Sequence, residues 1–162
     1  MIRKWDAKET RPLLTLWLES TIHAHPFINE TYWHESIAVV RDVYLPAAST
    51  WVWEEDATIK GFVSVMESRF IGALFVAPDA IRRGIGSALL SRLIAECEKG
   101  PWRQMLAIIG DGHNNAGSLA IHKKFGFTVA GQLRSVGYKM GDWRDTLIMQ
   151  RALGDGDWTL PE

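Results

Sequence analysis

The chain has 162 residues, of which 47% are hydrophobic, so it can close one substantial core and has little room for a second. Eighteen basic and nineteen acidic residues leave a net charge near −1, which argues against nucleic acid as a partner. The single cysteine excludes an internal disulfide, and the sequence shows no signal-peptide pattern and no membrane-spanning apolar run. We therefore expect a cytoplasmic protein with no membrane partner.

The N-terminal part of the chain predicts one short strand followed by two helices. Residues 2–5 read as the strand, and Asp6 with Glu9 three residues later has the pattern of a capping box. A second helix is expected to begin near Asn29 and to end at Pro46. The apolar faces of the two helices are Leu13, Leu14, Trp17 and Leu18, and then Trp33, Ile37, Val40 and Tyr44.

The rest of the chain predicts strands and helices without an internal linker or repeat. Three antiparallel strands are expected at residues 49–54, 58–66 and 70–76. They are followed by a helix at 84–98, a strand at 105–109, a helix at 115–125 and two strands at 128–138 and 143–151. Residues 1–153 are thus predicted to form one domain, with residues 154–162 as a polar C-terminal tail.

A basic glycine turn between an apolar strand and an amphipathic helix predicts a site for a pyrophosphate. Gly84 and Gly86 allow a ligand to approach the backbone, and the unpaired N–H groups of the first helical turn point toward it. Arg82 and Arg83 add positive charge at the rim. The pattern is not a dinucleotide fingerprint, because Leu89 stands where a third glycine is required, and it lacks the Gly-Lys-Ser/Thr of a Walker loop.

Two segments resemble the cofactor motifs of the GNAT acetyltransferase superfamily. Arg-Gly-x-Gly after a strand is similar to its acetyl-coenzyme A (acetyl-CoA) pyrophosphate loop, although Ile81 stands where the family usually has Arg or Gln. Residues 114–127 resemble the second motif, in which an Asn near a helix start contacts the cofactor and Gly-Phe closes the helix. Here Asn115 is a natural helix cap and Gly126 a natural terminator. Two motifs in the family's order argue against coincidence.

The resemblance implies an α/β fold with a mixed central sheet, splayed fourth and fifth strands, and flanking helices. In that fold the acetyl-pantetheine arm enters between the splayed strands, so fixed backbone donors of the fourth strand hold the thioester carbonyl. The implied acetyl-CoA contacts are Phe75, Val76, Arg82, Arg83, Gly84, Ile85, Gly86, Ser87, Asn115 and Ser118. No metal is expected, because the pair His23 and His25 has no carboxylate or cysteine spaced to complete a site.

Transfer of an acetyl group to an amine requires a base for the ammonium proton and is helped by an acid for the departing thiolate. The resemblance places His122 where many members of the superfamily have a tyrosine that serves as the general acid. Histidine can also donate a proton near neutrality. A structural, hydrogen-bonded histidine is the alternative. Glu67, at the end of the third expected strand, is the predicted base, and His113 and Tyr138 are the alternatives. The competing interpretation is that the Glu67 carboxylate is simply solvated and has no catalytic role.

The two halves of the chain indicate different acceptors. The C-terminal third resembles phosphinothricin and methionine sulfoximine N-acetyltransferases, which implies a small amino-acid-like acceptor and a possible homodimer. Residues 16–90 resemble small bacterial protein-lysine acetyltransferases. We favour the small amine over a protein lysine, with a non-catalytic acyl-CoA sensor as the non-enzymatic alternative. The predicted acceptor contacts are His25, Phe27, Trp33 and Tyr138.

Overall fold

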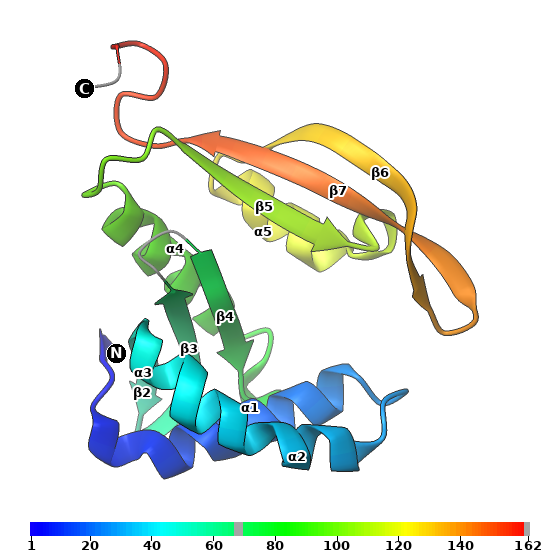
Figure 1. Ribbon diagram of the computed structural model, residues 1–162. Coiled ribbons are helices and arrows are strands. Elements are labelled where there is room, and N and C mark those ends of the chain that lie inside the picture. The colour runs from blue at the N-terminus through cyan, green and yellow to red at the C-terminus, as the bar shows by residue number, and fades with distance from the viewer. Residues whose placement is uncertain (67–69, 161–162) are drawn as a thin grey trace. The chain divides into compact units, whose positions relative to one another are not determined.

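A computed structural model describes residues 1–66 and 70–160, and the chain divides into two compact units, Met1–Leu93 and Ile94–Glu162 (Figure 1). The predicted order of strands is confirmed, and each strand end lies within one residue of its predicted position. Among the described residues, no helix is both long enough and apolar enough to cross a membrane.

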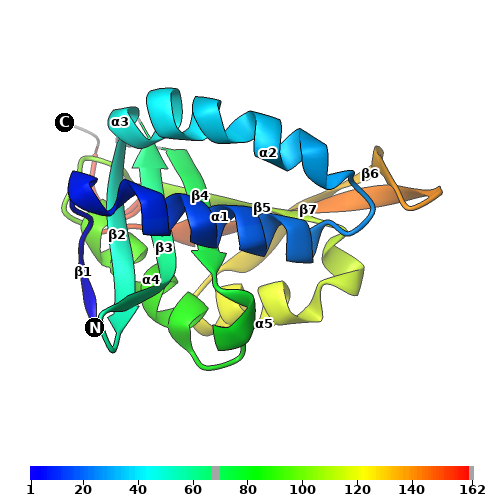
Figure 2. The same ribbon diagram turned by 90° about the horizontal axis from the view of Figure 1, so that it is seen from below.

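The N-terminal unit contains an antiparallel sheet with the strand order β1-β2-β3-β4. Its strands are β1 (Ile2–Lys4), β2 (Ala48–Glu55), β3 (Thr58–Met66) and β4 (Phe70–Val76). Helices α1 (Thr10–Ala24) and α2 (Glu30–Val39) lie across one face of this sheet (Figure 2). The first turns of α4 (Ile85–Cys97) pack on the other face at Gly61, where an added Cβ would lie 2.9 Å from Ile85 Cγ2. The sheet is therefore covered on both faces.

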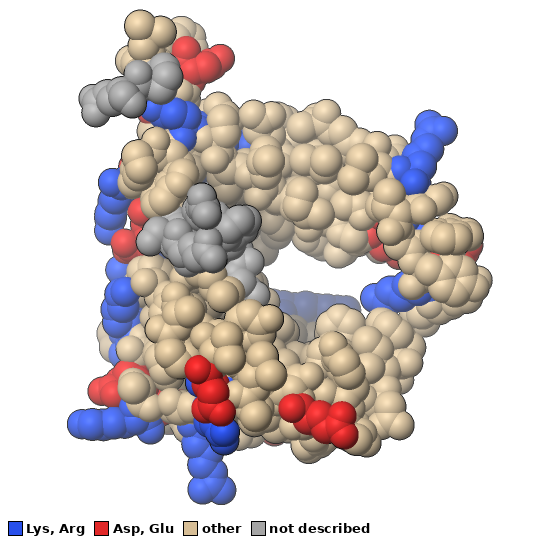
Figure 3. Space-filling model, viewed as in Figure 1, with Lys and Arg blue, Asp and Glu red and all other residues tan. Residues whose placement is uncertain are grey.

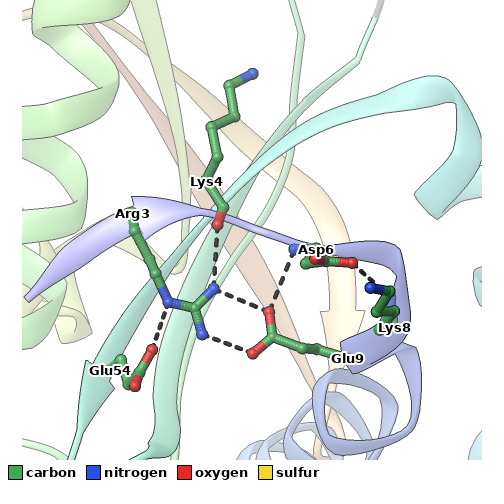
Figure 4. A network of polar contacts seen from close by, with 6 residues as sticks. All are labelled: Arg3, Lys4, Asp6, Lys8, Glu9 and Glu54. Carbon is green, nitrogen blue, oxygen red and sulfur yellow. Dashed lines mark hydrogen bonds and ion pairs between the residues drawn. The ribbon is translucent and has the colours of Figure 1, made fainter.

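The start of α1 is tied to the sheet by a polar network around Arg3 (Figure 4). The predicted capping box is present: the Asp6 side chain accepts from Lys8 N–H at 2.9 Å, and the Glu9 side chain accepts from Asp6 N–H at 3.2 Å. Arg3 also pairs with Glu9, at 2.6 Å, and with Glu54 of β2. The hydrogen bond from the Arg3 guanidinium lowers the pKa of Glu9, so Glu9 stays charged in the folded protein.

The second helical region differs in detail from its prediction. The Asn29 side chain accepts from Thr31 N–H at 2.9 Å, which confirms the predicted start of α2. After Val39 the chain forms a π-helical turn, Val40–Tyr44, and then the short helix α3, Leu45–Ala47. The helix thus ends one residue beyond Pro46, because Pro46 lies in the first turn of α3, where its missing N–H removes no helical bond.

The C-terminal unit has an antiparallel sheet with the order β5-β7-β6, and α5 (Ala116–Lys124) lies against it. Its strands are β5 (Gln104–Gly110), β6 (Thr128–Lys139) and β7 (Asp142–Ala152). Alternation along β5 buries Met105, Ala107 and Ile109 and leaves Leu106 and Ile108 exposed. The face of this sheet seen in Figure 3 carries few charged side chains.

The grouping of the strands agrees with the expected fold class. β4 is an outer strand of one sheet and β5 an outer strand of the other, and no pairing between them is recorded among the described residues. The α/β class with flanking helices is confirmed, and the described strands of the expected central sheet form two antiparallel sheets.

The segment predicted as a polar tail is held by one side chain as far as residue 160. The Arg103 guanidinium donates to Gly156 O at 3.3 Å, to Thr159 Oγ1 at 2.5 Å and to Leu160 O at 3.1 Å. Trp158 nevertheless remains 91% exposed. Polar contacts of Arg103 therefore hold residues 156–160 of the tail.

Candidate functional site

The turn between β4 and α4 has the backbone geometry of an anion site. Ala88 N–H donates to Gly84 O at 3.0 Å, which is the first helical bond of α4. The N–H groups of Ile85, Gly86 and Ser87 precede that bond, so none of them has an acceptor within the helix. Three such donors at the positive end of a helix dipole form a favourable site for phosphate.

The two glycines of this turn have different roles. Gly84 has φ +83°, a left-handed conformation that favours glycine, and no atom lies within 4 Å of the position of an added Cβ. A Cβ on Gly86 would lie 3.8 Å from Val76 Cγ2, which is an ordinary contact. Gly84 is therefore required for the backbone conformation and leaves open space above the turn.

The two arginines of the turn also differ, although the sequence suggested equal roles. Arg83 pairs with Glu55 at 2.7 Å, whereas no ion pair of Arg82 is recorded among the described residues. Lys60 pairs with Asp79 at 2.7 Å at the start of the turn, and this contact lowers the pKa of Asp79. Arg82 is consequently the arginine whose charge is available to a ligand.

The edge of β4 presents the backbone of Val76. Ala77 N–H donates to Lys60 O at 2.8 Å, so the alternation of an antiparallel pair turns the backbone groups of Val76 away from β3. Ser20 Oγ donates to Val76 O at 3.0 Å, which leaves the Val76 N–H directed toward the open edge. The same alternation turns the backbone groups of Phe75 toward β3. The Phe75 ring stacks on the Phe62 ring, with centroids 5.4 Å apart.

The predicted residues of the C-terminal unit are connected through the first turns of α5. The Asn115 side chain accepts from Ser118 N–H at 3.3 Å, and Ser118 O lies 2.7 Å from His122 Nδ1. Because a carbonyl can only accept, His122 carries a proton on Nδ1, and Nε2 is the nitrogen left for chemistry. In the neutral ring Nε2 accepts a proton, and only in the imidazolium does it donate one.

The end of α5 fixes the orientation of His122. Gly126, at φ +84°, donates to Lys123 O at 3.0 Å, and Phe127 N–H donates to His122 O at 3.0 Å, which is a Schellman motif. The Phe127 ring meets the His122 ring edge to face at 5.2 Å. The Gly-Phe pair seen in the sequence therefore holds the histidine both by its backbone and by its ring.

Three of the four predicted acceptor contacts lie together in the N-terminal unit. The His25 ring is 5.8 Å from Phe27 and 5.3 Å from Trp33, and Trp33 is 6.3 Å from Trp17. Trp33 Nε1 is buried without a hydrogen-bond partner among the described residues. Tyr138 belongs to the C-terminal unit, where it is 65% exposed beside Trp143.

Some predicted residues fall elsewhere. Glu67, the predicted base, lies outside the described residues, as does the side chain of His113. Burial raises the pKa of the Cys97 thiol, with a smaller contribution from Glu96, so Cys97 is a poor nucleophile. The described residues contain no group of three or more His, Cys, Asp or Glu that could hold a metal ion.

Two residues that shape the site were not predicted from the sequence, namely Ser20 and Glu55. They are 56 and 28 residues away from their partners Val76 and Arg83. Local spacing carries no signal for contacts at such separations, which only the folded sheet creates.

Comparison with known proteins shows similarity to acetyltransferases over most of the chain. The profile of the Acetyltransferase (GNAT) family matches residues 10–127. The crystal structure of a GNAT superfamily phosphinothricin acetyltransferase from Sinorhizobium meliloti, in complex with AcCoA, superimposes with a TM-score of 0.73 at 27% identity, covering 100% of this chain and 92% of that one.

Individual relatives match different shares of the chain. Peptidyl-lysine N-acetyltransferase YiaC of Escherichia coli is 57% identical over 56% of this chain and 62% of its own length. Phosphinothricin N-acetyltransferase of Alcaligenes faecalis is 56% identical over 56% of this chain and 45% of its own length. The chain thus spans less than two thirds of either relative. L-amino acid N-acyltransferase MnaT of E. coli is 32% identical over 86% of this chain and 80% of its own length.

Proposed function

Because the chain belongs to the GNAT acetyltransferase family, we propose that it transfers an acetyl group from acetyl-CoA to an amine by direct attack. The observation that carries this proposal is the glycine turn, with three N–H groups free of helical acceptors and the available charge of Arg82. These groups would bind the pyrophosphate of the cofactor. The relative from S. meliloti, which was crystallised with AcCoA, supports the choice of cofactor.

In the proposed reaction the amine nitrogen forms a bond to the thioester carbon while the bond from that carbon to sulfur breaks. The Val76 N–H, directed toward the open edge of β4, would stabilise the charge that develops on the carbonyl oxygen. Glu67 would take the proton of the ammonium, directly or through water. His122, as the imidazolium with its Nδ1 held by Ser118, would give the Nε2 proton to the thiolate.

We propose a small amino-acid-like amine as the acceptor. The similarity to an L-amino acid N-acyltransferase, over 86% of this chain and 80% of that protein, supports this choice. The cluster of His25, Phe27 and Trp33 offers rings to an acceptor. The similarity to YiaC keeps a protein lysine as the second candidate. The homodimer and the cytoplasmic location implied by the resemblance and by the composition stay predictions.

The test is release of free thiol from acetyl-CoA, measured against phosphinothricin, methionine sulfoximine, methionine sulfone, polyamines and lysine peptides. We expect turnover with the amino-acid analogues. His122→Phe should lower kcat about a hundredfold or more, which is the range for a lost proton donor, without changing the acetyl-CoA dissociation constant. Lys124→Gln, an exposed change on the same helix, is the matched control and should leave kcat unchanged.

Other outcomes would redirect the proposal. Turnover with lysine peptides alone would assign the protein-lysine activity. Binding of acetyl-CoA without thiol release for any amine would mean a sensor rather than an enzyme. An unchanged kcat in His122→Phe would make the histidine structural, and an unchanged kcat in Glu67→Gln would remove Glu67 as the base.

A further inference from the structure

The N-terminal unit contains a cavity of about 330 Å³ between its sheet and its helices. Phe62, Ala73 and Phe75 line it from the sheet, and Trp17 and Tyr44 line it from α1 and the π-helical turn. At roughly 30 Å³ for each water-sized atom group, the space holds on the order of ten non-hydrogen atoms. A side chain of the size of methionine or phenylalanine would fit.

The wall of this cavity is mostly apolar. The described residues that line it include no charged side chain. Of its two hydroxyl-bearing side chains, Ser64 bonds to Thr50 Oγ1 at 2.7 Å, and Tyr44 is half exposed. Ser64 and Thr50 are both buried, so their polarity is largely satisfied by each other. The cavity therefore favours an apolar group and disfavours a charged one.

A pocket of this size that opens to the solvent on one side can admit a ligand. One wall is the π-helical turn Val40–Tyr44, a rare geometry that occurs frequently at functional sites. Tyr44 lines the cavity although it is 48% exposed, so this wall reaches the solvent. These features indicate a binding cavity rather than a packing defect.

The cavity adjoins the strand that is proposed to hold the thioester. Phe75 turns its ring into the cavity, and its neighbour Val76 turns its N–H toward the open edge of β4. An acceptor whose amine is at the thioester therefore has an apolar space next to the strand that is proposed to hold the thioester.

We propose that this cavity binds the apolar side chain of the acceptor amino acid and thereby selects methionine-sized or phenylalanine-sized side chains over charged ones. The proposal rests on the proposed N-acetyltransferase function and adds a specificity site to it. Ala73 is the position that controls the volume, because its methyl group lines the cavity from β4.

The experiment compares acceptors whose side chains grow by single methylenes: glycine, alanine, 2-aminobutyrate, norvaline and norleucine, followed by methionine and phenylalanine, with lysine as the charged counterpart of norleucine. Both kcat/KM and the dissociation constant from calorimetry are measured. In the wild type we expect each methylene to improve both by roughly fourfold, which is the free energy of burying one such group. Lysine should fall well below norleucine.

Ala73→Leu should flatten this series by filling the cavity, so that the ratio of kcat/KM for norleucine to kcat/KM for glycine falls toward one. Ala38→Leu, on the exposed side of α2, adds the same atoms outside the cavity and should preserve the series. If Ala73→Leu does not fold, the wild-type series alone decides.

A flat series in a wild-type protein that releases thiol would overturn the cavity assignment and leave the acetyltransferase function intact. An equal loss for glycine and norleucine in Ala73→Leu would do the same. If kcat/KM instead rises with each methylene of the acyl chain, from acetyl- to propionyl- to butyryl-CoA, the cavity belongs to the acyl donor and our proposal is wrong. Absence of thiol release with every amine refutes the function, and the calorimetric series still tests the cavity.

Discussion

The two units of the chain use their sheets differently. The N-terminal sheet is covered on both faces, and every residue of β3 from Gly61 to Val65 is buried. In the C-terminal sheet, burial alternates along β5, and Leu106 and Ile108 are exposed. A sheet packed between two layers gives a rigid base, and rigid elements hold binding groups in place. The N-terminal unit is therefore suited to fix a cofactor turn and a cavity.

The C-terminal unit contributes through a helix rather than through its sheet. His122 is held by a backbone carbonyl, by the Schellman motif and by one aromatic ring, and all three restraints come from residues 118–127. This local construction separates the chemistry of His122 from the binding of phosphate by the turn before α4. Substitutions in the glycine turn should consequently affect cofactor affinity, whereas substitutions at His122 should affect turnover.

The largest expected effect is that of Gly84→Asp. The substitution strains a left-handed backbone and places a carboxylate above the N–H groups that are proposed to bind pyrophosphate. We expect acetyl-CoA to bind about a hundredfold more weakly or worse, as measured by calorimetry. Gly141→Asp is the matched control, because Gly141 has φ +78° and open space in the β6–β7 hairpin. Similar affinity losses in the two variants would contradict the assignment of the turn.

A smaller effect distinguishes the two arginines of that turn. Arg82→Gln should weaken acetyl-CoA binding roughly tenfold, because a charge-assisted hydrogen bond to phosphate is lost. Arg83→Gln should change the acetyl-CoA affinity by about twofold, because the Arg83 guanidinium is already paired with Glu55. Calorimetry at low and moderate salt checks both values. Equal losses would show that Arg83 exchanges Glu55 for the phosphate when the cofactor binds.

The features that could be predicted from the sequence are those written in local spacing. The capping pairs at Asp6 and Asn29 and the glycine that ends α5 each involve residues within a few positions, so their hydrogen bonds follow from the sequence pattern. The π-helical turn did not follow, because apolar residues at Ile37, Val40 and Tyr44 fit an α-helix equally well.

The site was predictable to the same degree. The glycine turn and the Asn115 cap are local and were found, whereas the difference between Arg82 and Arg83 depends on Glu55 in a distant strand. The apolar cavity depends on packing between helices and a sheet, which no spacing encodes. The tautomer of His122 depends on a carbonyl one turn earlier, and it becomes visible only once the helix is built.

The smallest expected effect lies at the other end of the N-terminal unit, in Glu9→Gln. The hydrogen bond from Arg3 lowers the pKa of Glu9 in the folded protein, so its stabilisation is complete above the ordinary glutamate pKa of about 4.3 and is lost as the pH falls through the folded value. Glutamine does not titrate. Glu9→Gln should therefore be less stable by roughly 1 kcal/mol at pH 7, since the ion pair is partly exposed, and the difference from the wild type should be smaller at pH 3.

Urea unfolding of Glu9→Gln at the two pH values measures this difference, with Glu19→Gln, an exposed change on α1, as the control. A loss of stability that is the same at pH 3 and pH 7 would show that the Arg3 network contributes by packing rather than by charge. The Arg3 network ties β1 and the start of α1 to β2 and contains no residue of the glycine turn or of α5. Acetyl-CoA affinity and kcat should thus stay unchanged in Glu9→Gln, which separates the stability of the N-terminal unit from the functions assigned to the two units.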